Sequence, residues 1–421
     1  MQNGNSGVSE RLLGCPDCDL VLEASHVDSH HIATCPRCGA LLFKGRGHRL
    51  DRAVALQLAA LILFIVANAF PFITFRMEGL EQLSHLTTGI IEFYKRGLWP
   101  LSVVVALATI CFPLVKILGS LYVLLPLRRG RVLPGAAGVF RAVETLRPWA
   151  MMEVFLLGVI VAYVKLVDFA TLDLGPALFA FAGLIVIVTA ADAVIEPREV
   201  WNGLGPPSGP AGPAPEMASA RRATGHSLCH TCHYLHLSAL PPHSCPRCGA
   251  ALHRRKPNSL TRCLALVATA AVLYIPANVF PVMTVVSFGK GEADTIMSGV
   301  KAFIAADMWP LALLVFFASV TVPVLKLVGL TYLILSVKFG WHWRPRDRTK
   351  LYRVVDMVGR WSMIDVFMVS ILIALVKLGN LATIEPGIGV TSFAGVVVIT
   401  MIASHAFDPR LIWDQLEENN G

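Results

Sequence analysis

The feature that most constrains this chain is an apolar run that contains a lysine and that occurs twice. The first copy, LWPLSVVVALATICFPLVK, extends from Leu98 to Lys116, and the second, MWPLALLVFFASVTVPVLK, extends from Met308 to Lys326. Both copies keep a Trp-Pro pair, an interior Pro and the final Lys in register. Because a charged side chain near the middle of a membrane span is costly, a repeated one indicates a specific role.

The composition is that of a membrane protein, since 55% of the 421 residues are hydrophobic and only 15% are charged. Eight apolar runs approach or exceed the roughly 20 residues that a spanning helix needs. They are 54–75, 98–125, 149–167, 176–195, 263–285, 308–337, 361–378 and 390–407. The sequence therefore predicts an all-α polytopic membrane protein with eight spans.

The basic residues predict the orientation, because cytoplasmic loops are enriched in Lys and Arg. If the N-terminus is cytoplasmic, most of the 36 Lys and Arg fall on the cytoplasmic side. The loops on the other side hold only Arg76, Lys95, Arg96, Lys290 and Lys301. Both termini are therefore predicted to be cytoplasmic. The net charge of +8 is explained by these basic loops beside anionic lipid, so we expect no nucleic-acid partner.

Two pairs of CxxC knuckles stand ahead of the two sets of spans. Their cysteines are Cys15, Cys18, Cys35 and Cys38, then Cys229, Cys232, Cys245 and Cys248. In a reducing cytosol, two knuckles at this distance are typical of one four-thiolate metal site. We predict structural zinc in each site, with a rubredoxin-like iron centre or redox disulfides as alternatives. The knuckles CPDC and CHTC lack a following Gly, which departs from the rubredoxin pattern and favours zinc.

The chain is a tandem duplication. Its halves align at an offset of 210 residues through the second span and of 212 from Arg141 onward. Each unit has four spans, so both units enter the membrane in the same direction, as in transporters with parallel repeats. The expected domains are a ribbon at 1–50, a membrane unit at 51–201, a Pro/Gly-rich linker at 202–225, a ribbon at 226–256, a membrane unit at 257–413 and a tail at 414–421.

The intramembrane lysines have acidic candidates as partners. Lys116 lies in the inner half of span 2, and Glu153 lies near the inner end of span 3. Lys326 and Asp365 occupy the same places in the second half. We therefore predict Lys116–Glu153 and Lys326–Asp365 pairs, which would relieve unpaired charges in the membrane. Such pairs either pin spans together or line a polar cavity for a lipid head group or a titrating group.

An ANxFP motif closes the first span of each half, and it contains Asn68 and Asn278. The Pro removes an amide donor and the Asn offers a side-chain amide at a similar depth. Either a kink or simple termination of the helix is expected there, and the two Asn are candidate polar groups for a ligand. The segments that follow, 76–97 and 287–307, show helical spacing of apolar residues and are predicted to be amphipathic helices on the outer surface.

The combination of these motifs resembles the paraquat-inducible protein A family of Gram-negative inner membranes. The resemblance is carried by the cysteine knuckles, the ANxFP motif at 67–71, Trp99-Pro100, Pro113 with Lys116, and their second-half copies. It implies a multi-pass inner-membrane protein that works with an MCE-domain tunnel protein across the periplasm. Together, the two would move phospholipid or other lipophilic molecules between the membranes.

Two other functions remain as alternatives to lipid transport. One is a membrane redox protein with two rubredoxin-like centres, and the other is an anchor or scaffold for the tunnel protein. The chain contains no GxxxxGK[ST] stretch, so we expect no ATP hydrolysis. We also expect that the chain is not an enzyme.

Overall fold

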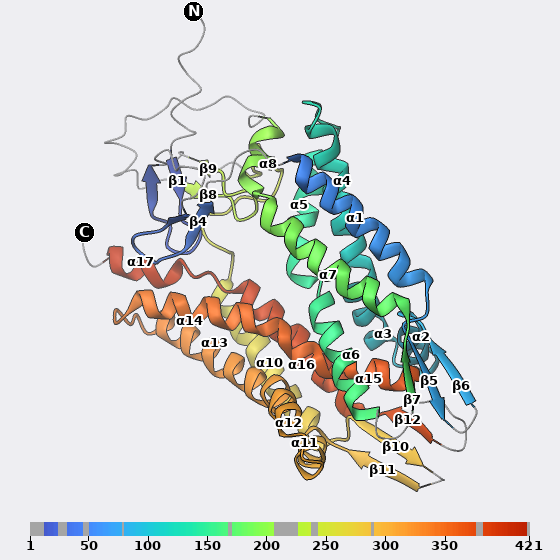
Figure 1. The fold of residues 1–421 in the computed structure, drawn as a ribbon. Helices are drawn as coiled ribbons and strands as arrows, with labels where there is room; N and C mark the ends of the chain where they lie inside the picture. Colours follow the sequence, from blue (N-terminus) through green and yellow to red (C-terminus); the bar gives the residue numbers. More distant parts are fainter. Residues whose placement is uncertain are drawn as a thin grey trace, which may run out of the picture.

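The computed structural model describes residues 12–23, 32–44, 50–77, 80–166, 171–205, 226–236, 243–287, 290–375 and 382–418. Within them, eight helical segments are long and apolar enough to cross a membrane, as predicted. Figure 1 shows these helices between a small β ribbon region at one end and two β sheets at the other. Residues 206–225, most of the predicted linker, lie outside the described ranges.

Four spans are single helices. They are α1 (Leu50–Ala69), α7 (Pro176–Val194), α10 (Ser259–Val279) and α16 (Ile388–Ala406). The first span of each unit packs along the fourth, so α1 lies against α7 and α10 lies against α16. Each of these helices is apolar nearly all round, as expected of a helix whose exposed face meets lipid.

Spans 2 and 6 each contain a π-helical turn. Span 2 consists of α3 (Trp99–Ala106), the turn Leu107–Cys111 and α4 (Phe112–Leu127). Span 6 repeats this with α12 (Trp309–Phe316), the turn Phe317–Thr321 and α13 (Val322–Lys338). Pro113 and Pro323 each stand two residues after the end of such a turn. Because Pro cannot donate to the carbonyl one turn earlier, the wider turn accommodates the interruption of the hydrogen-bond ladder.

Spans 3 and 7 are each interrupted by a 3-10 turn, and the two turns begin at equivalent positions of the duplicated halves. Span 3 consists of α5 (Ala136–Leu146), a 3-10 turn at Arg147–Trp149 and α6 (Met152–Leu166). Span 7 consists of α14 (Pro345–Val358), a 3-10 turn at Gly359–Met363 and α15 (Ile364–Leu375). In span 3 the backbone N–H of Met151 donates to the carbonyl of Ala108, in the π turn of span 2, over 3.4 Å. This hydrogen bond between spans 3 and 2 thus satisfies part of the irregular backbone of these two spans.

The centre of the molecule is α15, in which every residue is buried. It packs against α6 at Gly158, where an added Cβ would lie 3.0 Å from Cβ of Phe367. It also packs against α2 (Thr88–Lys95) at Gly89, where an added Cβ would lie 2.4 Å from Oγ of Ser370. One continuous apolar core therefore joins the two units.

The prediction for the outer segments is right only in part. The first segment contains the helix α2, but it begins in a hairpin of β5 (Ile73–Met77) and β6 (Leu80–Ser84) instead of being helical throughout. β7 (Thr171–Leu174), from the loop between spans 3 and 4, pairs with β5. The second unit repeats the sheet with β10 (Met283–Ser287), β11 (Lys290–Asp294) and β12 (Ala382–Pro386), followed by the short helix α11 (Ile296–Ala305). The third strand lies far away in sequence, so local spacing did not reveal it.

The two ribbons are built from short hairpins. Ribbon 1, residues 12–44, contains β1 (Leu12–Gly14), β2 (Val21–Glu23), β3 (Ile32–Thr34) and β4 (Leu41–Lys44). Ribbon 2, residues 226–252, contains β8 (Ser227–Leu228) and β9 (Leu235–His236) and a bridge between Ser244 and Ala251. Short helices end the units near them, α8 (Pro197–Gly203) in the first unit and α17 (Leu411–Glu418) in the second.

Each ribbon docks on the membrane unit of the other half. The cysteines of ribbon 1 pack with apolar side chains of α13, α14 and α17, including Trp413. The cysteines of ribbon 2 pack with side chains of α1, α4, α5 and α8, including Trp201. Equivalent arginines hold both contacts, because Arg353 donates to the carbonyl of Cys38 over 3.2 Å and Arg141 donates to the carbonyl of Cys248 over 3.1 Å. The ribbons are therefore exchanged between the halves.

We predict that Arg353→Asp destabilises the chain. Arg353 Nε lies 2.6 Å from a carboxylate oxygen of Asp17, so the change replaces an ion pair by two like charges. A hydrogen bond to a charged group contributes about 1.5–3 kcal/mol. Adding Asp17→Arg restores opposite charges and is expected to recover most of the lost melting temperature of the purified chain.

The control for this prediction is Arg141→Asp, which weakens the contact with ribbon 2 instead. Asp17→Arg is expected to leave the Arg141→Asp defect unrescued, since Asp17 belongs to ribbon 1. Rescue of both arginine variants, or of neither, would contradict the exchanged docking.

Candidate functional site

The two four-cysteine groups have the geometry of closed metal sites. All eight thiols are buried, and within each group the sulfur atoms lie within 4.8 Å of one another. Sγ of Cys15 and Cys38 are 3.5 Å apart, and Sγ of Cys229 and Cys248 are 3.6 Å apart. Four thiolates around a tetrahedral Zn²⁺ at about 2.3 Å would be roughly 3.8 Å apart. Each group could therefore hold one metal ion.

The knuckle backbones are prearranged for such an ion. The residue after each knuckle donates its N–H to the carbonyl of the first cysteine and has a positive φ, between 53° and 73°. These residues are Asp19, Gly39, His233 and Gly249. Asp and His are among the few side-chain-bearing residue types found repeatedly at positive φ. The two knuckles without a following Gly thus adopt the same turn as the two that have one.

The polar cluster of the first unit gathers Lys116, Glu144, Arg147 and Asp192. Lys116 Nζ lies 2.6 Å from Oδ2 of Asp192, and 7% of the lysine side chain is exposed. Arg147 Nε lies 3.8 Å from the same oxygen, and Arg147 Nη1 lies 3.7 Å from Oε2 of Glu144. The cluster joins α4, the end of α5 with its 3-10 turn, and the inner end of α7. We call it the first-unit cluster.

The predicted Lys116–Glu153 pair is wrong. Glu153 is exposed, and Asp192 of span 4 takes its place beside the lysine. The prediction assumed a regular helix from Trp149 onward, whereas the 3-10 turn and the extended Ala150 interrupt span 3 just before Glu153. That interruption changes the face on which the first turn of α6 presents its side chains.

The predicted Lys326–Asp365 pair is also wrong. Lys326 is 1% exposed and donates to Oγ1 of Thr400, in α16, over 2.9 Å. Asp365 is 3% exposed and lines a cavity nearer the outer sheet, beside β10 and α11. The other residues around that cavity are Val282, Met283, Asp294, Thr295, Ile296, Gly299, Phe303, Val315 and Met368. Lys326 and Asp365 therefore lie in different surroundings and have different neighbours.

Asn68 and Asn278 close their own helices. The side-chain amide of Asn68 donates to the carbonyl of Phe64 over 2.8 Å, and that of Asn278 donates to the carbonyl of Tyr274 over 2.9 Å. Both helices end at the next residue, so the motif terminates the helix rather than kinking it. The chain then turns into the outer sheet.

Sequence reasoning missed Arg147, Asp192 and Thr400. The sequence feature that could have revealed them was a difference between the two halves, not a residue that both halves share. Where the first unit has Arg147 and Asp192, the second has Gly359 and Ser404. An added Cβ on Gly359 would lie 2.6 Å from Lys326 Nζ, so this lysine occupies space near the position of the first unit's arginine. At these equivalent positions, the charged network of the second unit is accordingly smaller. Ser404 Oγ donates to Oδ1 of Asp356 over 3.0 Å, and Nδ1 of His405 lies 4.0 Å from the same oxygen.

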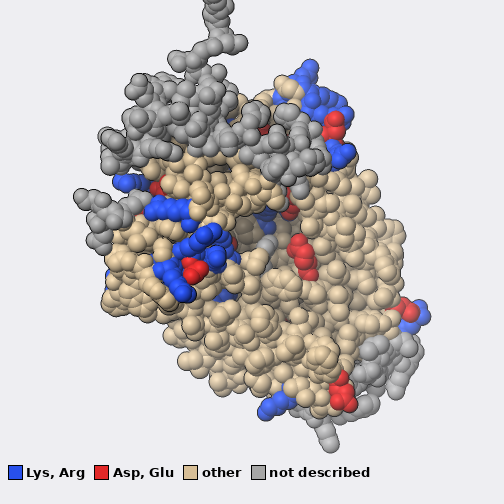
Figure 2. Space-filling view, turned by 60° about the vertical axis from the view of Figure 1, so that its left-hand side comes forward, with Lys and Arg blue, Asp and Glu red and all other residues tan. Residues whose placement is uncertain are grey.

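One face of the molecule is hollowed. Figure 2 shows this hollow, with basic side chains at its depth and acidic ones near its edge. Trp149 of the first unit and His405 of the second approach to 6.4 Å between ring centroids. Glu144, Arg147 and Asp192 of the first unit, and Asp356 and His405 of the second, have partly exposed side chains. Charged or titratable groups thus occur within the spans of both units.

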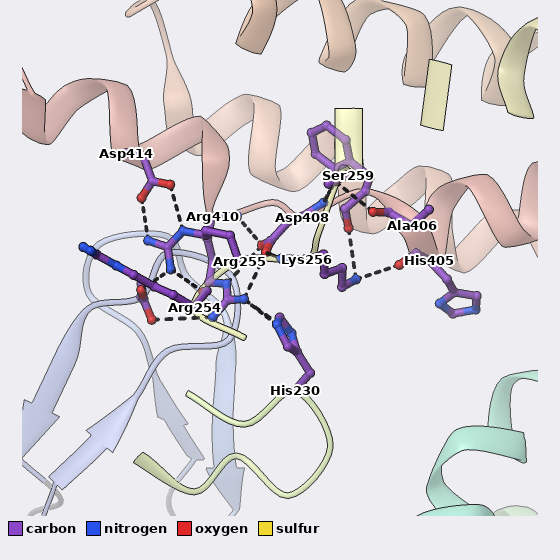
Figure 3. A network of polar contacts seen from close by, with 12 residues as sticks. His230, Arg254, Arg255, Lys256, Ser259, His405, Ala406, Asp408, Arg410 and Asp414 are labelled. Carbon is purple, nitrogen blue, oxygen red and sulfur yellow. Dashed lines mark hydrogen bonds and ion pairs between the residues drawn. The ribbon is translucent and has the colours of Figure 1, made fainter. Parts of the chain in front are cut away.

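A second polar network holds both ribbons to the second unit (Figure 3). Arg255, just before α10, bonds Asp19 of ribbon 1 and Asp414 of α17, each at 2.5 Å. Arg410 bonds Asp408 and donates to a ring nitrogen of His230 of ribbon 2 over 2.7 Å. Burial, reinforced by Arg410, lowers the pKa of His230 to about 4, so its ring is neutral at pH 7 and can accept this bond. Burial opposes ionisation of Asp408, but Arg410 outweighs it and holds the pKa of that carboxyl below its ordinary value.

Known proteins resemble this chain over nearly its whole length. An intermembrane transport protein PqiA of Escherichia coli (strain K12) is 33% identical over 414 residues, which cover 96% of each chain. A lipophilic envelope-spanning tunnel protein A of the same strain is 30% identical over 408 residues, 96% of this chain and 92% of the relative. A probable intermembrane transport protein of Haemophilus influenzae is 27% identical over 411 residues, 96% of each. No solved structure matches.

The family assignment rests on both halves. The family model described as paraquat-inducible protein A matches residues 50–205 and 260–417, which are the two membrane units. The eight apolar spans and the two four-cysteine groups fit a multi-pass inner-membrane protein of this kind. The chain belongs to the paraquat-inducible protein A family.

Proposed function

We propose that this chain is the inner-membrane component of an intermembrane lipid transport system. It takes phospholipid or a similar lipophilic molecule from the bilayer and passes it to an MCE-domain tunnel protein that spans the periplasm. The names of the relatives support intermembrane transport as the general role. The observation that carries the lipid is the hollow in one face of the molecule, where charged side chains interrupt a largely uncharged surface. Charged side chains also lie within the spans themselves.

A phospholipid fits this combination of surfaces. Its acyl chains need apolar walls, which the exposed faces of the spans offer, and its head group needs charged or hydrogen-bonding partners. Arg147, Asp192 and Glu144 provide such partners in the first unit, and Lys116 holds Asp192. The interrupted helices beside them are typical of transporters, in which discontinuous spans line substrate sites.

The proposed orientation puts the ribbons and both termini in the cytoplasm. The loops and segments on the side of the ribbons hold most of the Lys and Arg of the sequence, which favours that side. The sheet end, with β5–β7 and β10–β12, then faces the periplasm and is the natural place for the tunnel protein to dock. The four-cysteine groups hold zinc in this proposal, as closed sites that stabilise the ribbons.

The lipid proposal is tested by photo-cross-linking in the intact chain. A phospholipid with a photoreactive acyl chain, reconstituted with the protein, is expected to label spans that border the hollow. Lys116→Ala combined with Lys326→Ala is expected to reduce this labelling severalfold, because the lysine that holds Asp192 and the buried lysine of the second unit are both lost. Lys338→Ala with Lys350→Ala, which removes two other lysines of the second unit, serves as the control. Wild-type labelling in the Lys116/Lys326 variant, or none in the wild type, would contradict the proposal.

The zinc proposal is tested by metal analysis. The purified chain is expected to be colourless and to contain about two zinc ions, one for each four-thiolate site. Cys35→Ser is expected to reduce the content to about one and to lower the melting temperature, since binding energy stabilises the folded ribbon. Cys111→Ser, which alters an exposed thiol outside both groups, is expected to change neither value. Iron with a visible charge-transfer band would favour the redox function instead.

A further inference from the structure

We propose that the first-unit cluster binds the head group of a zwitterionic phospholipid, with the phosphate on Arg147 and a primary ammonium on Glu144 and Asp192. The inference rests on the proposed function. It adds the half of the chain that holds the head group and the class of lipid that the head group defines.

The charges of the cluster match a dipolar ligand. Lys116 and Arg147 are basic, and Glu144 and Asp192 are acidic, so their formal charges cancel. A purely anionic head group gains attraction from the first two and meets repulsion from the second two. A head group that carries both a phosphate and an ammonium finds an opposite charge for each, which is how charged sites discriminate between ligands.

Arg147 has hydrogen-bond donors to offer. Its closest carboxylate contacts, at 3.7 and 3.8 Å, are longer than hydrogen bonds, and 37% of its side chain is exposed. A guanidinium presents its donors in a planar fork that matches two oxygens of a phosphate. The guanidinium of Arg147 can thus still donate hydrogen bonds to a ligand, while Glu144 and Asp192 hold the guanidinium in place.

The two acids are also accessible. The side chain of Glu144 is 21% exposed and that of Asp192 is 25% exposed. Lys116 differs, since it is nearly buried and lies 2.6 Å from Asp192. We assign Lys116 the role of a positioning residue that fixes Asp192, while the second oxygen of that carboxylate and Glu144 receive the ammonium.

The second unit lacks this arrangement. Gly359 and Ser404 stand at the positions equivalent to Arg147 and Asp192. Lys326, the equivalent of Lys116, is buried and donates to Thr400. In the described part of the second unit, the equivalent positions therefore offer one fewer cation and one fewer carboxylate. Of the two duplicated units, the first is therefore the one that carries the charged groups for this head group.

The test measures which lipid the chain retains. The wild-type chain is equilibrated in nanodiscs with equal amounts of phosphatidylethanolamine and phosphatidylglycerol, purified into detergent and analysed by mass spectrometry. It is expected to retain phosphatidylethanolamine preferentially. Glu144→Gln with Asp192→Ser, which leaves two cations without acids, is expected to shift the ratio toward phosphatidylglycerol by about fivefold or more. Ser is the residue that the second unit already carries there.

Two further variants make the test decisive. Glu81→Gln with Asp347→Asn removes the same formal charge at exposed positions elsewhere and is expected to keep the wild-type ratio. Arg147→Gly, which copies Gly359, is expected to lower retention of both lipids while metal content stays unchanged. Metal content also reports whether the Glu144/Asp192 double variant folds. If that variant does not fold, the result of Arg147→Gly decides the test.

The outcomes separate this inference from the proposed function. If the wild-type chain and the Glu144/Asp192 variant both retain lipid at the ratio of the nanodisc, the head-group assignment is overturned and lipid transport stands. If the wild-type chain retains no lipid and a photoreactive lipid labels no span, the proposed function itself is overturned.

Discussion

Charges and interrupted backbone inside the hydrocarbon region must find partners within the protein, and much of this structure follows from that constraint. Lys116 finds Asp192 and Lys326 finds Thr400, in each case across the unit to its fourth span. The π turns ahead of Pro113 and Pro323 and the 3-10 turns of spans 3 and 7 lie next to these contacts. In the membrane, where water cannot solvate a free carbonyl, such interruptions persist only where another element meets them.

The duplication has been used unequally. α15 is buried on all sides and contacts both α6 and α2, whereas its counterpart α6 has exposed residues that include Glu153. The same inequality appears in the polar groups, since the first unit keeps a partly exposed mixed cluster and the second keeps a buried lysine. The two copies of one sequence thus differ: one forms the centre of the fold, and the other keeps partly exposed charges of both signs.

Local patterns predicted the parts of the structure that local physics determines. The eight apolar runs became the eight spans, and the spacing of Cys15, Cys18, Cys35 and Cys38 predicted the gathering of four thiols. The acidic partners of the lysines were not predictable in this way, because breaks at 107–111 and 147–151 change which faces meet. The outer sheets and the exchange of the ribbons depend on residues far apart in sequence, such as Thr74 with Asp173 and Arg353 with Cys38. Periodicity within a window carries no information about such contacts.

The exchanged ribbons have a consequence for the order in which the chain is made. Arg141 and Cys248 are 107 residues apart, so ribbon 2 finds its docking surface already synthesised when it leaves the ribosome. Arg353 lies 315 residues after Cys38, and Trp413 follows later still. Ribbon 1 precedes both membrane units and therefore waits for the second unit to be synthesised before its apolar face is covered. Its four thiols lack this cover throughout that interval, and spans of the second unit complete a domain that was made before either unit.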